Sequence, residues 1–305
     1  MTIESRLVND AYLFVHFINE KIDTENSEQV YFSVSKDGQN WITLNEGKPI
    51  LTSILGERGA RDPFIITSPD RDKFYIIATD LSIYHNNDWN RAQSAGSQSI
   101  IVWESTDLIH WSNQRLAKVA AETAGCTWAP EAFYSEEEGQ FIVYWASRTN
   151  FGADKQRLFF AKTKDFQTFT QPEVYIEKEH DVIDTNMIKE DGQYYRFTKN
   201  ENVASIIFEV SDRILGEFTA IDSNLEDVFG VEGPVCFKLN NEDRWCLLLD
   251  AYKEEGKYIP YYTTDLHSGQ FTKGADLNMT VHAKHGGVIS ITTEEYDALL
   301  KAYGK

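Results

Sequence analysis

A short signature occurs five times along this 305-residue chain and limits the folds that the chain can adopt. Each copy follows a strand-like run and consists of a Ser or Thr (Val in the fourth copy), one further residue, an Asp, and an aromatic residue shortly afterwards. The copies read SVSKDGQNW, WESTDLIHW, AKTKDFQTF, FEVSDRILGEF and YYTTDLHSGQF, with their acids at Asp37, Asp107, Asp165, Asp212 and Asp265. Their spacing of 47 to 70 residues is close to the length of a four-stranded propeller blade.

Further strand-like runs, rich in β-branched and aromatic residues, precede the signatures. Directly before them lie QVYFSVS, SIIVWES, RLFFAKT, ASIIFEV and KYIPYYT. One element upstream lie YLFVHFIN, KFYIIATD, QFIVYWAS, QYYRFTKN and RWCLLLDAY. Four of these second runs follow a polar hairpin turn, and before each turn comes one more strand: DPFII, PEAFY, DTNMI and EGPVCFKL. The repeat therefore contains at least three strands.

The two ends of the chain complement each other. The first copy has no strand ahead of YLFVHFIN, whereas an unpaired strand, HGGVISIT, lies near the C-terminus. The sequence therefore predicts an all-β, five-bladed β-propeller, a single catalytic domain over residues 1–305, whose C-terminal strand completes the N-terminal blade. An open β-sandwich is the alternative fold. The one predicted helix covers residues 292–304, with Thr292 or Thr293 as N-cap and Gly304 as stop, as a short surface element.

The charge and the cysteines restrict the classes of function. A net charge of −19 opposes binding to nucleic acid or to an anionic membrane, and a neutral substrate fits better. The N-terminal residues show no leader pattern, so we expect a cytoplasmic protein, or a secreted one if a leader was removed. The odd number of cysteines favours reduced core thiols rather than disulfides: Cys126, Cys236 and Cys246.

Candidate functional residues come from the strands expected to line the central channel, because the same ends of those strands meet at one mouth. Four of them offer an acid at what we take to be the equivalent position, and the fifth offers a histidine: Asp62, Glu131, Asp184, Glu232 and His285. Two carboxyl groups facing each other across an uncharged sugar are what glycoside hydrolysis requires. The chain lacks zinc-ligand spacing, a nucleophile elbow and a phosphate-binding loop.

Five motifs, one in each blade, make the resemblance specific: GARDPFI, CTWAPEAFY, DVIDTNMI, VEGPVCF and KHGGVISIT. In this order they resemble glycoside hydrolase family 43, whose members are five-bladed β-propellers that act on plant polysaccharide side chains and oligosaccharides. The resemblance implies that Asp62 is the general base, that Glu232 is the general acid, and that Asp184 orients that acid and modulates its protonation. Members invert the anomeric configuration, which predicts a base-to-acid separation of roughly 6.5 to 9.5 Å.

The same resemblance implies substrate-binding residues. Glu131 would accept hydrogen bonds from sugar hydroxyls, and Trp128 would stack on a sugar ring. His285 would help to hold a central water or ion, with a structural calcium ion as a possible occupant of the channel and no cofactor required. Arg61 is a weaker candidate, because consecutive residues of a strand face opposite ways.

The sequence thus predicts an exo-acting inverting hydrolase that releases a terminal pentose, α-L-arabinofuranose or β-D-xylose, from plant-derived oligosaccharides such as those of xylan. An exo-β-galactosidase on the same scaffold and a non-catalytic carbohydrate-binding propeller stay open. A glycoside phosphorylase ranks last, because few Lys or Arg residues fall at the starts of the inner strands. The expected partner is the oligosaccharide alone, and the oligomeric state is not predicted.

Overall fold

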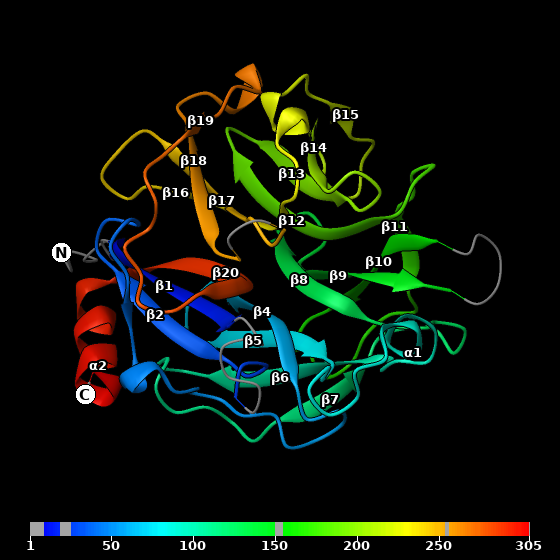
Figure 1. The fold of residues 1–305 in the computed structure, drawn as a ribbon, viewed down its shortest axis with the longest axis horizontal. Helices are drawn as coiled ribbons and strands as arrows, with labels where there is room; N and C mark the ends of the chain where they lie inside the picture. Colours follow the sequence, from blue (N-terminus) through cyan, green and yellow to red (C-terminus); the bar gives the residue numbers. More distant parts are fainter. Residues whose placement is uncertain (1–8, 19–25, 150–154, 254–255, 305) are drawn as a thin grey trace.

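A computed structural model describes residues 9–18, 26–149, 155–253 and 256–304. The first eight residues, which carry part of the expectation about a leader, lie outside these ranges. Five four-stranded antiparallel sheets surround a common centre, as Figure 1 shows. The predicted all-β five-bladed propeller is therefore confirmed.

Each sheet runs from an inner strand at the centre to a short outer strand. The first comprises β20 (Ala283–Thr292), β1 (Asn9–Ile18), β2 (Tyr31–Ser35) and β3 (Ile42–Thr43). The second comprises β4 (Ala60–Thr67), β5 (Phe74–Asp80), β6 (Ser99–Ser105) and β7 (Arg115–Lys118), and the third β8 (Trp128–Ser135), β9 (Gln140–Arg148), β10 (Gln156–Thr163) and β11 (Glu173–Ile176). The fourth comprises β12 (Val182–Glu190), β13 (Gln193–Asn200), β14 (Ser205–Ser211) and β15 (Thr219–Ala220), and the fifth β16 (Glu232–Lys238), β17 (Trp245–Asp250), β18 (Tyr258–Thr263) and β19 (Thr272–Lys273).

The ring closes where the two ends of the chain meet. Strands β1 and β20 pair in an antiparallel register that sets Phe14 opposite Val288, so the C-terminal strand completes the first blade as predicted. Close approach requires a glycine here, because a Cβ on Gly286 would lie 2.0 Å from the carbonyl oxygen of Val15. Closure gives β1 a hydrogen-bonded partner on each side, β2 and β20.

The repeated Asp residues have a structural role. The Asp37 carboxylate accepts hydrogen bonds from the backbone N–H groups of Gln39 and Asn40, at 2.8 and 2.7 Å, and so caps the turn after β2. Equivalent bonds form at Asp107 and Asp165. The predicted fourth copy is wrong by one residue. Ser211 ends β14 and accepts a hydrogen bond from the N–H of Arg213, so Arg213, not Asp212, occupies the position of the acid.

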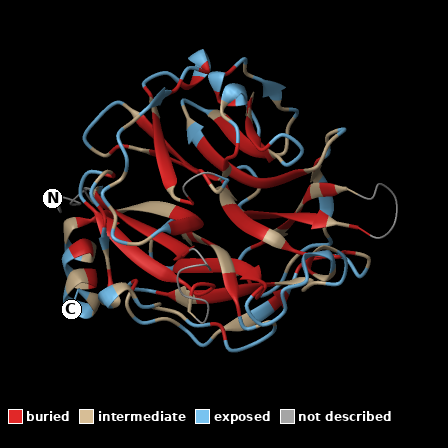
Figure 2. Cartoon of the chain, in the orientation of Figure 1, coloured by how far each residue is buried: buried red, intermediate tan, exposed pale blue. Residues whose placement is uncertain are grey.

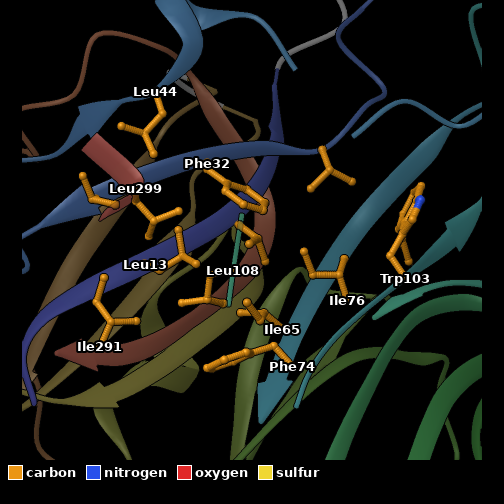
Figure 3. Packing of buried hydrophobic residues seen from close by; sticks show 14 of the residues in the cluster. Leu13, Phe32, Leu44, Ile65, Phe74, Ile76, Trp103, Leu108, Ile291 and Leu299 are labelled. Carbon is orange, nitrogen blue, oxygen red and sulfur yellow. The ribbon is translucent and has the colours of Figure 1, made fainter. Parts of the chain in front are cut away.

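Hydrophobic clusters fill the interfaces between neighbouring blades, and the buried residues of Figure 2 follow the strands. Figure 3 shows one such interface, where Leu13 and Phe32 of the first blade lie near Ile76 of the second. Similar clusters join the second blade to the third, the third to the fourth, the fourth to the fifth, and the fifth back to the first. All three cysteines are free and buried, which confirms the prediction of reduced core thiols.

The predicted C-terminal helix is present as α2 (Thr293–Tyr303), capped by Thr292, whose side chain accepts from the N–H of Glu295. It is more than a surface element. Leu299 is fully buried in the cluster between the first two blades, and the Tyr303 hydroxyl donates to the carbonyl of Ile109 in the second blade. The helix α1 (Trp89–Ser94) and the 3-10 helices Asn45–Gly47, Asn224–Asp227 and Leu266–Ser268 were not predicted.

None of the helices in the described ranges has the length and apolar character that a membrane crossing would need.

We predict that Leu299→Ala lowers the free energy of unfolding by about 2 to 5 kcal/mol, because it leaves a cavity in the cluster that joins the first two blades. Leu116→Ala is the matched control, since this β7 side chain is exposed and its loss should cost less than about 1 kcal/mol. Urea denaturation followed by tryptophan fluorescence measures both. Equal losses would show that α2 does not support the ring.

Candidate active site

A cavity of about 410 Å³ opens at the end of the inner strands where β4, β12 and β16 begin. Both charged and aromatic side chains surround it. The lining residues are Phe17, Arg61, Asp62, Leu81, Trp89, Gln93, Trp128, Ile183, Asp184, Lys199, Glu201, Glu232, Tyr252, Lys284 and His285. The structure therefore brings together the three acids predicted to be catalytic, and Arg61, Trp128 and His285 with them.

Every inner strand carries a one-residue β-bulge near this mouth. On four strands the bulge has a residue with positive φ: Asp62, Ala129, Asp184 and Gly233. Only Asp62 and Asp184 are thus equivalent, which corrects the prediction of four acids in one register; Glu232 lies one residue before its bulge residue, and Glu131 two residues after. A bulge also turns consecutive side chains to the same side, so Arg61 lines the cavity beside Asp62.

His285 lies at the centre of the acids. Its Nδ1 is 3.5 Å from Asp62 and 3.9 Å from Asp184, and its Nε2 is 3.8 Å from Glu131. Burial lowers the pKa of His285, but the Asp184, Asp62 and Glu131 carboxyl groups outweigh it and raise the pKa well above the ordinary value. These surroundings favour the protonated form of the imidazole.

The surroundings of Asp62 favour its ionised form. Thr79 donates a hydrogen bond of 2.8 Å to its Oδ2. Burial raises the pKa of Asp62, but the contact with His285, the charge of Arg61 and the Thr79 hydrogen bond together lower it below the ordinary value of an aspartate. A carboxylate that stays charged inside a cavity has the property that a general base needs.

The surroundings of Asp184 favour its protonated form. Burial, together with the nearby Glu232 and Asp62 charges, raises the pKa of Asp184 to about 6, although His285 and Lys199 lower it. Its Oδ2 accepts the backbone N–H of Gly233 at 3.1 Å, so it fixes the backbone directly after Glu232. Glycine is needed there, because Gly233 has φ +52° and a Cβ would lie 2.9 Å from the His285 ring.

Glu131 does not line the cavity, and the prediction that it bonds sugar hydroxyls does not fit its position. The side chain is 2% exposed and lies behind His285. Its Oε2 accepts hydrogen bonds from Asn186 at 2.9 Å and from the Tyr144 hydroxyl at 3.3 Å. Burial raises the pKa of Glu131 to about 7 in spite of these partners. The geometry instead makes it a support for the imidazole.

Glu232 forms the opposite wall with two lysines. Lys199 of β13 donates to its Oε2 at 2.8 Å, and the Nζ of Lys284 lies 4.0 Å from its Oε1. Lys284 in turn pairs with the buried Asp250 at 2.6 Å. Burial raises the pKa of Asp250 to about 7, although Lys284 lowers it. The cavity therefore contains more cations than the sequence suggested, but acids oppose each of these two lysines.

An aromatic wall faces the cavity beside Asp62. The indole rings of Trp89 and Trp128 meet edge to face with centroids 6.2 Å apart. The Arg61 guanidinium lies over the rings of Trp89 and Phe17 and is anchored by Glu28 at 2.9 Å. Trp89 lines the cavity and is 44% exposed, so part of its indole face is open to a ligand.

Sequence reasoning missed Trp89, Lys199 and Lys284. Lys284 directly precedes His285, so the KHGG motif contained a signal, and the β20 bulge places both side chains at the cavity. Lys199 is the next-to-last residue of the QYYRFTKN run, a lysine on a middle strand, which was a weaker signal. Trp89 lies in an unpredicted helix, and nothing in its local sequence linked it to the centre of the ring.

The site does not offer a set of direct metal ligands. Across the described part of the chain, no group of three or more His, Cys, Asp and Glu side chains is arranged to hold a metal ion. A calcium ion in the central channel, held with the help of His285, therefore stays a prediction.

Comparison with known proteins identifies the family of the chain. A family model described as a probable glycosyl hydrolase domain, related to family 43, matches residues 8–297. An α-L-arabinofuranosidase of Bifidobacterium longum is 30% identical over 277 residues, an alignment that covers 78% of this chain and 25% of that protein. The chain thus spans about a quarter of the length of this relative.

Solved structures share the fold. A family-43 protein of Bacillus licheniformis superposes with a TM-score of 0.57 at 16% identity, covering 93% of this chain and 50% of that one. An exo-β-1,3-galactanase of Phanerochaete chrysosporium gives a TM-score of 0.53 at 16% identity, covering 71% and 50%. With the family model matching nearly the whole chain, this protein belongs to glycoside hydrolase family 43.

Proposed function

We propose that this protein is an exo-acting, inverting glycosidase that releases a terminal pentose, with α-L-arabinofuranose first and β-D-xylose second, from plant-derived oligosaccharides. The observation that carries the proposal is the gathering of Asp62, Asp184 and Glu232 around one cavity whose surroundings hold Asp62 ionised. The arabinofuranosidase relative supports the choice of arabinose. Galactose is the alternative sugar, because exo-β-1,3-galactanases share this fold.

In the proposed reaction the Asp62 carboxylate takes a proton from a water molecule, which attacks the anomeric carbon. Glu232 delivers its proton to the leaving oxygen as the glycosidic bond breaks. Asp184 holds the backbone N–H of Gly233 and so orients the segment that carries Glu232. His285 stabilises the charge of Asp62. Gly233 and Glu131 lie against the imidazole ring and leave it little room to rotate.

Hydrolysis of nitrophenyl α-L-arabinofuranoside, β-D-xyloside and β-D-galactoside tests the proposal. Wild type should release nitrophenol from the arabinoside fastest, and Asp62→Asn and Glu232→Gln should each lower kcat/KM by about 10²- to 10⁴-fold, the usual contribution of a general base or acid. Glu136→Gln is the control, since this acid is exposed in the β8–β9 turn. Near-full activity in either active-site variant, or no release by wild type from any of the three, would contradict the mechanism.

The pH dependence follows from the charges around Asp62. Because the pKa of Asp62 is lowered, the base stays ionised until pH falls through that low value, which sets the acidic limb of the activity. His285→Asn removes the main neighbouring cation, so the acidic limb of kcat/KM should move to higher pH. Thr79→Val removes one hydrogen bond and should move the limb less. An acidic limb that stays in place in both variants would show that these groups do not act on the base.

The exposed indole of Trp89 is expected to stack on the substrate. Trp89→Ala should raise KM for an arabino-oligosaccharide by about 10-fold. This factor corresponds to the loss of about 1 to 1.5 kcal/mol of binding free energy from the stacking contact. Trp89→Phe should restore most of the affinity. Inhibition by free arabinose, measured with the same variants, shows whether the stacked sugar is the terminal one. An unchanged KM in Trp89→Ala would remove the residue from the binding site.

A further inference from the structure

Lys199 is a buried charge that the reaction above does not use. Its side chain is 2% exposed, and its Nζ donates to Glu232 at 2.8 Å while lying 2.5 Å from Glu201. The ammonium also lies 4.7 Å from the centre of the Tyr252 ring. Burial lowers the pKa of Lys199, but Glu232, Asp184 and Glu201 raise it further above the ordinary value, so the group stays charged. A lysine is buried at this cost only where its charge is matched.

Glu232 is surrounded by charges on several elements. Lys199 lies on β13, and Glu201 is the first residue after that strand. Lys284 and His285 lie on β20. The remaining groups are Asp184 on β12, Asp250 on β17 and the Tyr258 hydroxyl on β18. Of the two lysines, only Lys199 is within hydrogen-bond distance, and it contacts Oε2. Lys284 remains 4.0 Å from Oε1 and is engaged by Asp250.

We propose that Lys199 is a positioning residue for the general acid: it occupies Oε2 of Glu232, so that Oε1 is the oxygen that carries and delivers the proton. The proposal rests on the function proposed above and extends it. Glu201 shares the same ammonium and thereby weakens the hold of Lys199 on Glu232. The pair Lys199 and Glu201 thus sets how readily the acid gives up its proton.

The chemistry gives Lys199 an effect on rate. As the proton leaves Oε1 for the leaving oxygen, the electron pair of the glycosidic bond moves to that oxygen, water oxygen bonds to the anomeric carbon, and Asp62 accepts the proton of the water. Negative charge develops on Glu232 during this step. Because Lys199 already lies 2.8 Å away, its ammonium stabilises that charge more in the transition state than in the protonated ground state.

The test is the pH profile of kcat/KM and kcat for three variants on nitrophenyl arabinofuranoside or whichever sugar wild type cleaves. Lys199→Met should lower kcat about 10- to 100-fold, the usual effect of losing a charge-assisted hydrogen bond, with little change in KM, and should move the alkaline limb to higher pH. Lys199→Arg keeps the charge and should leave the limb near its wild-type position.

Glu201→Gln should move the alkaline limb in the opposite direction, to lower pH, because Lys199 is then free to favour the ionised form of Glu232. Glu201 is 41% exposed on its side chain, so this variant keeps the test available even if Lys199→Met does not fold. Alkaline limbs that do not move, or that move in the same direction in Lys199→Met and Glu201→Gln, overturn the inference. A wild-type enzyme that cleaves none of the sugars overturns the proposed function and this inference with it.

Discussion

The ion cluster centred on His285 is the interaction on which the rest of the site depends. One buried imidazole lies within 3.5 to 3.9 Å of three acids that come from three different blades, Asp62, Glu131 and Asp184, and these acids favour its protonated form. Without that cation, three buried carboxyl groups would compete for protons, and Asp62 would lose its main reason to stay ionised. Because His285 belongs to β20, the pairing of β20 with β1 that closes the ring also places the imidazole among the acids.

The same cluster separates the roles of similar groups. Asp62 and Asp184 occupy equivalent bulge positions, yet the pKa of Asp62 is lowered whereas that of Asp184 is raised to about 6. The difference lies in their neighbours: Asp62 has Arg61, Thr79 and His285, whereas Asp184 also feels the negative charges of Glu232 and Asp62. Opposed shifts in neighbouring carboxyl groups are the usual means by which one site contains a base and a group that tunes an acid.

The sequence was sufficient to predict the blade number, the closure by residues 285–292, and the gathering of Asp62, Asp184, Glu232 and His285, because a strand period and a blade repeat fix where strand ends meet. It could not place Glu131 behind His285, since a bulge adds one residue to a strand without a clear sequence mark. Lys199 and Trp89 could not be assigned to the site from the sequence for another reason. Lys199 lies on a middle strand and Trp89 on an inserted helix, and the residues they contact are far away in the chain.

The protonation state of His285 is the most direct test of this account, and nitrogen NMR of ¹⁵N-histidine-labelled protein measures it. His16 offers an internal reference in the same blade, because burial lowers its pKa to about 4 and it should be neutral throughout the neutral range. The account predicts that both ring nitrogens of His285 are protonated at pH 7. Their resonances should change in Asp62→Asn, because that variant removes the neighbouring carboxylate. A neutral His285 with one unprotonated nitrogen at pH 7 would contradict it.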